Sequence, residues 1–289
     1  MERELFRRLK TELAGLGPHL VPKGWRSSDA VIAAVYFWAV IHDRPVSWAC
    51  IAGHWPGRER PRRLPSQSQM SRRLRKESVR RLIDALEERV LRAGRPAPLA
   101  CAMDGKALPV GAHSHDRNAT WGSGPGGHVR GYKLHTIRSL GGTLVIWRVA
   151  PMNVDEREMA RRMLPNARCA GYILADAMYD ANYLALRHGG QLLAPRRMGS
   201  HRGLAAGRHS PGRLRGKDLL ENTVSAFGRE VHHLRGGIER EYGYLSSTGG
   251  LLAPLPAWVR TYPRVRLWVQ AKLILAELRR VVRAQPHAA

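Results

Sequence analysis

The sequence predicts an all-α N-terminal domain followed by an α/β domain. Residues 1–97 carry apolar residues at helical spacing between capping signals. After Pro98 the pattern changes to short apolar runs punctuated by glycine and proline, which is typical of buried strands that alternate with helices. Hydrophobic residues make up 44% of the 289-residue chain, which is enough to bury a sizeable core.

Helices are expected at three places near the N-terminus. Apolar residues recur at helical spacing over residues 4–16. The run Ser27-Ser28-Asp29 supplies an N-cap for a helix over residues 29–42. Ser47 predicts a short third helix, over residues 48–54. Together they make the beginning of the chain helical.

A basic helix is expected at the end of this domain. Ser66 and Gln69 predict a capping box for a helix that continues to about residue 92. A short helix, a connecting loop and a basic helix form a helix-turn-helix-like layout, so we expect the basic face to contact DNA. An ordinary solvated arginine face is the alternative. The basic residues of this face are Arg72, Arg73, Lys76 and Arg80.

The second part of the chain predicts three strands, followed by helices that alternate with two further strands. The expected strands are residues 99–103, 131–140, 142–149, 171–175 and 191–194. The expected helices are residues 155–164 and 182–188, and most of residues 221–247. The segment 196–216 is rich in Arg, Gly and His, and a mobile basic loop is expected there. The domain limits follow as residues 1–97, 98–250 and a C-terminal helical tail of 251–289.

Composition narrows the class of protein. Lys and Arg total 48 against 23 Asp and Glu, a net charge of +25 that points to a polyanionic partner, most commonly nucleic acid. The longest uncharged apolar run, residues 30–41, is too short to span a bilayer, and no signal-peptide core is evident. Three widely spaced cysteines predict neither a disulfide framework nor a zinc pair, so we expect a cytoplasmic protein without a membrane partner. Rossmann and P-loop glycine patterns are also missing from the sequence.

Three acidic residues stand out in this basic chain. Asp104 and Asp176 each follow a predicted buried strand, and functional groups gather at the carboxyl ends of such strands. Glu239 shares a predicted helix face with Arg235 and His232. Carboxylates that converge in a basic groove are suited to Mg²⁺, which prefers oxygen ligands. Turn or helix-cap aspartates and a surface Glu–Arg pair are the alternative readings.

Asp180 competes with Asp176 for the same role, because both lie in the sequence ILADAMYD. Asp176 directly follows the apolar run, whereas Asp180 lies just before the helix expected from residue 182. That position is natural for a capping aspartate. We therefore expect Asp176 to be the functional carboxylate and Asp180 to be a cap.

Histidines and one tryptophan offer weaker signals. The histidines are not accompanied by cysteine partners or an HxxxH helix, so DNA-facing or surface positions are favoured over zinc binding. Trp121 lies in TWGSGPGG, which is expected to be a glycine-rich loop, where it could stack on a flipped base or serve as an exposed hydrophobic anchor. The histidines in question are His113, His115, His128 and His135.

Four sequence blocks together resemble a known family. They are MDGK at 103–106, GYKLHT at 131–136, ILADAMYD at 173–180 and RGGIEREYGYL at 235–245. These blocks look like those of the DDE transposases of bacterial insertion sequences, in the IS-four-like branch and its IS-five-like neighbour. The resemblance covers about residues 99–250. Two positions depart from the pattern of the branch, since His232 occupies the usual Tyr position and Ser246 the usual Lys position.

The resemblance implies a ribonuclease-H-like catalytic domain, in which a mixed central sheet is flanked by helices. It implies a catalytic and metal-binding triad of Asp104, Asp176 and Glu239, with Mg²⁺ as the cofactor and Mn²⁺ as a substitute. It also implies nicking of transposon ends followed by strand transfer to target DNA, in a homodimeric synaptic complex at the bacterial nucleoid. The DNA contacts expected in the last block are His232, Arg235 and Arg240.

Two other functions share the fold and the charge. A transposase-derived protein could bind DNA without catalysis, and a structure-selective nuclease could cut without joining. Metal-dependent cleavage distinguishes the first of these from a transposase, and a joining assay distinguishes the second.

Overall fold

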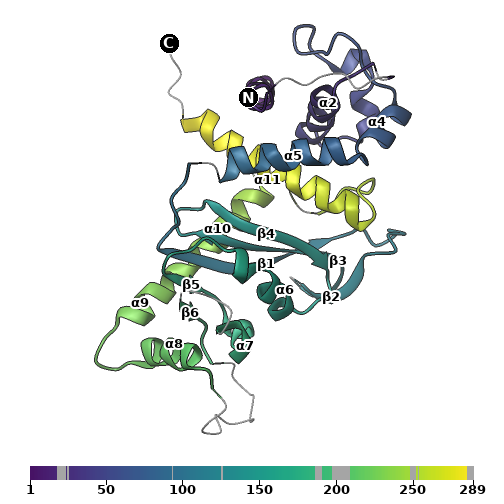
Figure 1. The fold of residues 1–289 in the computed structure, drawn as a ribbon. Coiled ribbons are helices and arrows are strands. Elements are labelled where there is room, and N and C mark those ends of the chain that lie inside the picture. The colour runs from purple at the N-terminus through teal and green to yellow at the C-terminus, as the bar shows by residue number, and fades with distance from the viewer. Residues whose placement is uncertain are drawn as a thin grey trace. The chain divides into compact units, whose positions relative to one another are not determined.

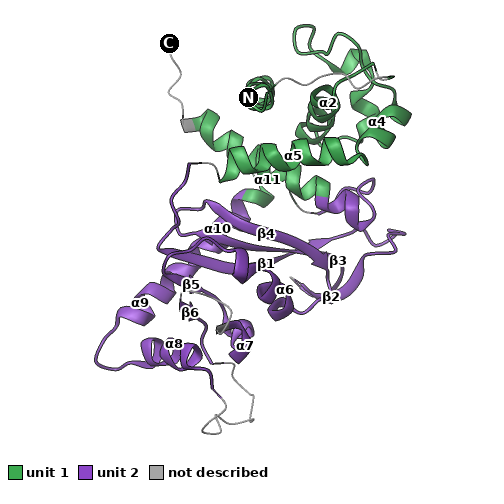
Figure 2. Cartoon of the chain, viewed as in Figure 1, with its two compact units in different colours: residues 1–93, 245–252, 267–289 green, residues 94–244, 253–266 purple. Residues whose placement is uncertain are grey.

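The computed structural model describes residues 1–17, 24, 26–92, 94–124, 126–185, 191–196, 209–247, 252 and 254–284. The chain divides into two compact units (Figure 2). Unit 1 comprises Met1–Ala93, Leu245–Leu252 and Leu267–Ala289, and unit 2 comprises Gly94–Tyr244 and Ala253–Arg266. Both units therefore contain part of the predicted C-terminal tail.

In the described part of the chain before residue 93, every regular element is a helix (Figure 1). These helices are α1 (Glu2–Ala14), α2 (Asp29–Ile41), α3 (Val46–Ala49), η1 (Ala52–His54), α4 (Gln67–Arg73) and α5 (Glu77–Leu91). Ser28 caps α2 by accepting the Val31 N–H, as the sequence predicts. From Ile32 to Ile41, α2 is buried on all sides, so it forms the centre of this unit.

The capping box at Ser66 and Gln69 is confirmed, but the single helix predicted after it is wrong. The helix ends at Arg73, and α5 begins at Glu77 after an extended Lys76. Met70 and Val79 are both fully buried. In one straight helix, residues nine apart would point in opposite directions, so the break lets both side chains enter the core.

Unit 2 is built on a mixed sheet of six strands (Figure 1). Its order is β2-β3-β1-β5-β6, and β4 also pairs with β3. Strands β1 to β4 are antiparallel where they pair, whereas β5 runs parallel to both β1 and β6. The strands are β1 (Ala100–Pro109), β2 (Thr120–Gly124), β3 (Gly127–Ser139), β4 (Leu144–Pro151), β5 (Tyr172–Leu174) and β6 (Gln191–Leu193).

Helices and short turns complete the unit. They are α6 (Glu156–Met163), η2 (Leu164–Asn166), η3 (Ala177–Tyr179), α7 (Asn182–Ala185), α8 (Pro211–Glu221), α9 (Phe227–His233), η4 (Leu234–Gly236) and α10 (Gly237–Ser246). The last helix of the chain is α11 (Tyr262–Ala284). Met103 of β1 and Ala175 after β5 belong to one buried cluster with α6, so the backbone just before Asp104 and Asp176 is fixed by the core.

Two further expectations, both about unit 2, differ from the structure. Strand β2 lies in the glycine-rich segment that the sequence predicts as a loop. A Cβ at Gly122 would be 2.6 Å from the Met152 carbonyl oxygen, so glycine permits the pairing of β2 with β3 at this position. Of the predicted basic loop 196–216, residues 197–208 lie outside the described residues. Residues 211–216 are helical, because Ser210 caps α8 and Pro211 begins it.

Among the described helices, none combines the length and the apolar character needed to cross a membrane.

Candidate active site

Asp104 and Asp176 occupy equivalent positions on two neighbouring parallel strands. The last parallel pair between β1 and β5 joins Ala102 to Leu174, and each aspartate lies two residues beyond it. Strand β1 continues past Asp104 while paired with β3, whereas β5 ends at Leu174. Both carboxylates therefore emerge where the parallel pairing stops, at the same edge of the sheet.

The Asp104 carboxylate is mostly enclosed and electrostatically perturbed. Its Oδ1 accepts the Gly105 N–H at 2.8 Å, and its Oδ2 lies 3.9 Å from a guanidinium nitrogen of Arg235. Burial raises the pKa of Asp104 to about 6, with further upward contributions from the charges of Asp176 and Glu156. The Gly105 N–H and Arg235 act in the opposite direction. A cation would relieve this concentration of negative charge.

The backbone around Asp176 is held from two sides. The Asp176 Oδ1 accepts the Met178 N–H at 2.8 Å and so caps η3. The neighbouring Ala175 donates its N–H to the Leu193 carbonyl of β6. Its carbonyl oxygen lies 2.9 Å from Nε2 of His232, on α9. The structure thus gives His232 a backbone partner beside Asp176, while its predicted DNA contact stays a prediction.

Glu239 lies on α10, a helix that is attached directly to the Asp104 backbone. The Tyr242 hydroxyl donates to the main-chain oxygen of Asp104 at 2.7 Å and lies 2.8 Å from Oγ1 of Thr136. The Glu239 side chain is 69% exposed, and its Oε1 is 3.7 Å from Arg235. Arg235 therefore lies within ion-pair distance of both Asp104 and Glu239.

Two glycines, Gly236 and Gly237, lie where α10 begins. Gly236 ends the short turn η4, and α10 starts at Gly237. A Cβ at Gly236 would meet no atom within 4 Å. The short turn η4 (Leu234–Gly236) separates α9 from α10, and no close contact requires glycine at position 236.

Within the described residues, no three His, Cys, Asp or Glu side chains are grouped closely enough to hold a metal ion. Two carboxylates, Asp104 and Asp176, are adjacent, and Glu239 is linked to Asp104 through Arg235. Oxygen donors of this kind are those that Mg²⁺ prefers, and Mg²⁺ sites often use only one or two carboxylates. The donor set therefore fits a divalent cation at Asp104 and Asp176.

Sequence reasoning missed a buried ion pair beside Asp104. Lys133 of β3 donates to Oε1 of Glu156 at 2.6 Å, and both side chains are largely buried. A Cβ at Gly105 would lie 2.9 Å from Cδ of Lys133. The pair accounts for the glycine after Asp104 and for the lysine in GYKLHT. The sequence blocks MDGK and GYKLHT contain these two residues, but they do not show that Glu156 is the partner of Lys133.

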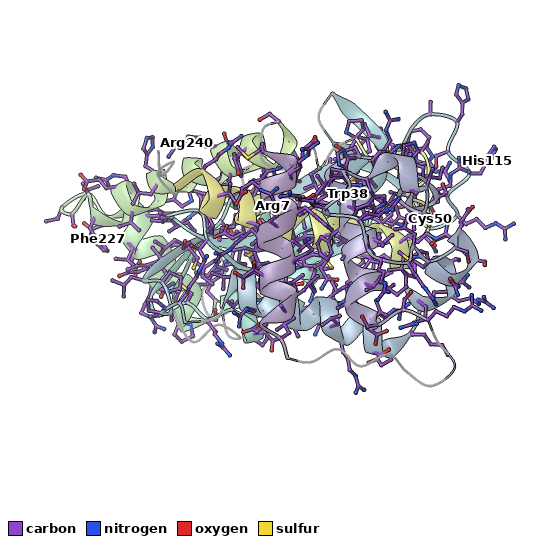
Figure 3. All side chains as sticks on the ribbon, turned by 90° about the horizontal axis from the view of Figure 1, so that it is seen from above. Arg7, Trp38, Cys50, His115, Phe227 and Arg240 are labelled. Atoms are coloured by element: carbon purple, nitrogen blue, oxygen red, sulfur yellow. The ribbon has the colours of Figure 1, made fainter. Side chains whose placement is uncertain are left out.

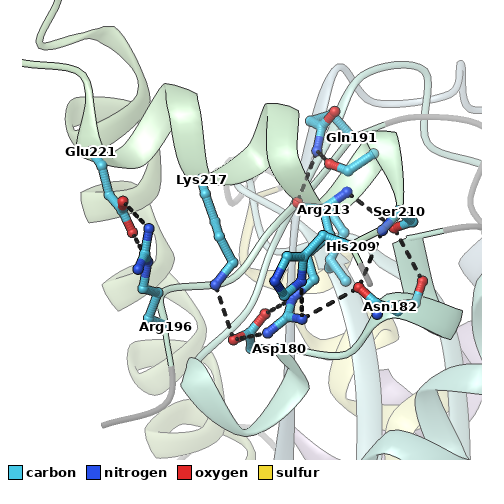
Figure 4. A network of polar contacts seen from close by, with 11 residues as sticks. Asp180, Asn182, Gln191, Arg196, His209, Ser210, Arg213, Lys217 and Glu221 are labelled. Carbon is cyan, nitrogen blue, oxygen red and sulfur yellow. Dashed lines mark hydrogen bonds and ion pairs between the residues drawn. The ribbon is translucent and has the colours of Figure 1, made fainter. Parts of the chain in front are cut away.

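Asp180 is engaged in a different network (Figure 4). Its two carboxylate oxygens accept from Arg213 at 2.6 and 2.8 Å, and Lys217 lies 3.3 Å from Oδ2. Arg213 and Lys217 hold the pKa of Asp180 below its usual value, although burial by itself raises it. The sequence predicts a helix cap here; the structure shows a carboxylate that ties the end of η3 to α8.

The basic residues of the N-terminal helices separate into two groups. Arg72 and Lys76 are exposed, as the prediction of a DNA-facing surface requires. Arg73 is 2% exposed, donates to the Ser27 carbonyl and forms an ion pair with Asp29. The prediction that Arg73 faces DNA is wrong, because its guanidinium fixes the start of α2. In the last block, Arg240 is exposed.

Comparison with known proteins identifies the family. The family described as "Transposase DDE domain" matches residues 95–253, more than half of the chain. None of the curated proteins and none of the solved structures compared with the chain matches it. The matched range contains β1 and β5 with their aspartates and α10 with Glu239. The chain therefore belongs to the DDE transposase domain family.

Proposed function

We propose that the chain is a transposase that nicks transposon-end DNA and joins the freed 3′-hydroxyl to target DNA. The observation that carries this is the matched position of Asp104 and Asp176, two residues beyond the last parallel pair of β1 and β5. Membership of the family supports transposition in general. The mixed sheet, with three antiparallel pairings and then parallel β5 and β6, supports a ribonuclease-H-like fold.

Asp104 and Asp176 would hold divalent cations, and Glu239 would complete the site from α10. Bound Mg²⁺ or Mn²⁺ would supply Lewis-acid stabilisation of the charge that develops on the phosphate. The chain itself positions these groups. The Gly105 and Met178 N–H groups orient one oxygen of each aspartate, and the Tyr242 hydroxyl fixes α10 to the backbone of β1.

Arg235 is suited to bind a DNA phosphate next to the carboxylates. Its guanidinium lies 3.9 Å from Asp104 and 3.7 Å from Glu239, and it is 22% exposed. Arginine can donate two parallel hydrogen bonds to phosphate oxygens. Arg72 and Lys76 would contact DNA from the N-terminal helices, and a homodimer would bring two element ends together.

The test is nicking and joining of a labelled element end in Mg²⁺ or Mn²⁺. Asp104→Asn and Asp176→Asn should each abolish nicking and retain DNA binding, since the arginines that contact the backbone are unchanged. Asp218→Asn is the matched control, because Asp218 is exposed on α8. Nicking by either site variant would refute the assignment of that aspartate.

The same assay separates the alternatives. A wild-type chain that binds DNA but never nicks it would be a non-catalytic DNA-binding protein. Nicking without joining would indicate a structure-selective nuclease.

A further inference from the structure

A buried carboxylate outside the active-site cluster organises a second region of unit 2. Asp116 lies in the loop between β1 and β2 and is 1% exposed. Its Oδ2 accepts from the Tyr132 hydroxyl at 2.8 Å and from the Thr261 N–H at 2.9 Å, and its Oδ1 accepts the Asn118 N–H at 3.0 Å. A buried charge is costly unless it is hydrogen-bonded, so these contacts hold three segments together.

Arg130 fixes the same loop from the side of β3. Its guanidinium donates to the carbonyl oxygens of Ser114, Asp116 and Ala119, at 2.8, 2.6 and 3.2 Å. The loop therefore has its conformation set by side chains rather than by a strand ladder. A loop that is held in this way presents its outer side chains at fixed positions.

The segment that Asp116 recruits from the C-terminal side is strained. Thr261 has a φ of 71°, a backbone conformation that β-branched residues rarely adopt. Its N–H is the one that Asp116 accepts, and the next residue, Tyr262, donates its N–H to Oδ1 of Asn118 at 3.2 Å. Such strain persists only where the surroundings over-determine it, and it gathers at functional positions.

Aromatic and basic side chains are exposed around this framework. Trp121 is 59% exposed and stacks on His128, with ring centroids 6.0 Å apart and an interplanar angle of 8°. Trp121 is opposite Arg130 in the β2–β3 pairing, so the two side chains lie on the same face of the hairpin. Arg130 holds the loop between β1 and β2 on that face. Arg117 and Arg264 are exposed in the two segments that Asp116 joins. His115 of the loop points outward (Figure 3).

These segments lack acidic side chains that could neutralise the arginines. Asp116 is the only acidic residue between Gly105 and Val154, and it is buried. The sequence from 253 to 276 contains none. Positive charge on a rigid scaffold, next to an exposed indole, is complementary to a sugar–phosphate backbone.

We propose that Arg117, Trp121, His128 and Arg264 form a basic-aromatic surface that binds duplex DNA. The arginines contact phosphates, and the indole packs against the sugars between them. This inference rests on the proposed function, to which it adds a DNA contact separate from the carboxylates and from Arg72, Lys76 and Arg235. Its occupant is duplex DNA rather than a protein, because the two arginines are exposed on segments whose only acidic residue, Asp116, is buried.

The experiment measures how the affinity of the full chain for a fluorescent DNA duplex depends on salt, in EDTA so that no nicking occurs. Each lost phosphate contact lowers the slope of log affinity against log salt by about 0.9, so Arg117→Ala/Arg264→Ala should lower it by about 1.8. Arg168→Ala/Arg215→Ala removes the same charge from exposed positions outside the surface and is the control. We expect the control slope to stay near that of the wild type.

Trp121 provides an independent measurement. Trp121→Ala should weaken binding about 10-fold with the salt slope unchanged, because the indole contributes apolar contact and no charge, and Trp121→Phe should restore most of it. Melting curves should not change, since the side chain is exposed. Equal slopes for the surface and control variants, with a wild type that binds and nicks, would overturn this inference alone. A wild type that binds no duplex would overturn it together with the proposed function.

Discussion

Asp180→Asn should destabilise the protein strongly while leaving the carboxylate site intact. The substitution keeps the size of the side chain but removes the charge that Arg213 and Lys217 share (Figure 4). The side chains of Asp180 and Lys217 are each 5% exposed, so the lysine is left charged and buried without its counter-ion. Breaking a buried pair in this way costs about 3–5 kcal/mol.

We expect the lower end of that range, about 3 kcal/mol, because the Arg213 side chain is 19% exposed and keeps contacts to Asn182 and His209. For a chain of this size, such a loss lowers the melting temperature by roughly 6–12 °C. Lys217→Met should cost less in the Asp180→Asn background than in the wild type, since removing both partners leaves no unpaired charge.

The effect has a defined pH dependence. Arg213 and Lys217 hold the pKa of Asp180 low in the folded chain, against the opposing effect of burial. The stabilisation is therefore complete above the unfolded-state pKa of about 3.9 and is lost as the pH falls through the lower folded-state pKa. The melting difference between wild type and Asp180→Asn should be constant near neutral pH and shrink in acid. An unchanged melting curve, or lost nicking at full stability, would refute this account of Asp180.

Three further predictions follow from single contacts. Arg73→Ala should lower the free energy of unfolding by about 2–3 kcal/mol, because a buried charged hydrogen bond is lost. Arg72→Ala, at an exposed position, should leave stability unchanged. Equal melting curves for the two variants would place Arg73 at the surface. Gly105→Ala should reduce nicking and lower the melting temperature, because its Cβ would meet Cδ of Lys133, whose Nζ is held by Glu156. Full activity with an unchanged melting curve would show that Lys133 can move freely. Tyr242→Phe should lower the free energy of unfolding by about 1 kcal/mol, measured in denaturant, because α10 loses its hydrogen bond to the Asp104 main-chain oxygen. The same loss should slow nicking. Lower stability without slower nicking would make Tyr242 only structural.

The sequence was most informative where function and core coincide. Asp104 and Asp176 follow short apolar runs, and those runs are the strands that the core fixes. The helix break after Arg73 was not predicted from the spacing of apolar residues, because that spacing does not show that two apolar stripes of opposite phase join at Leu74–Lys76. Strand β2 was not predicted because its glycines have no side chains that could show the alternation of a strand.

Partners distant in sequence could not be predicted at all. Asp180 is 33 residues from Arg213, and Lys133 is 23 residues from Glu156. A local pattern can indicate that an aspartate precedes a helix, and for Asp180 this favoured a cap. It cannot show that a later helix brings a guanidinium to the same carboxylate, because that depends on how the intervening chain folds.

Arg235 makes the carboxylate cluster partly self-compensating. Its contacts of 3.9 Å with Asp104 and 3.7 Å with Glu239 are at the outer limit of ion pairing, so the guanidinium offsets negative charge around Asp104 without being committed to either carboxylate. Contacts this long cost little to give up. The guanidinium can therefore turn toward a phosphate oxygen without breaking a close ion pair.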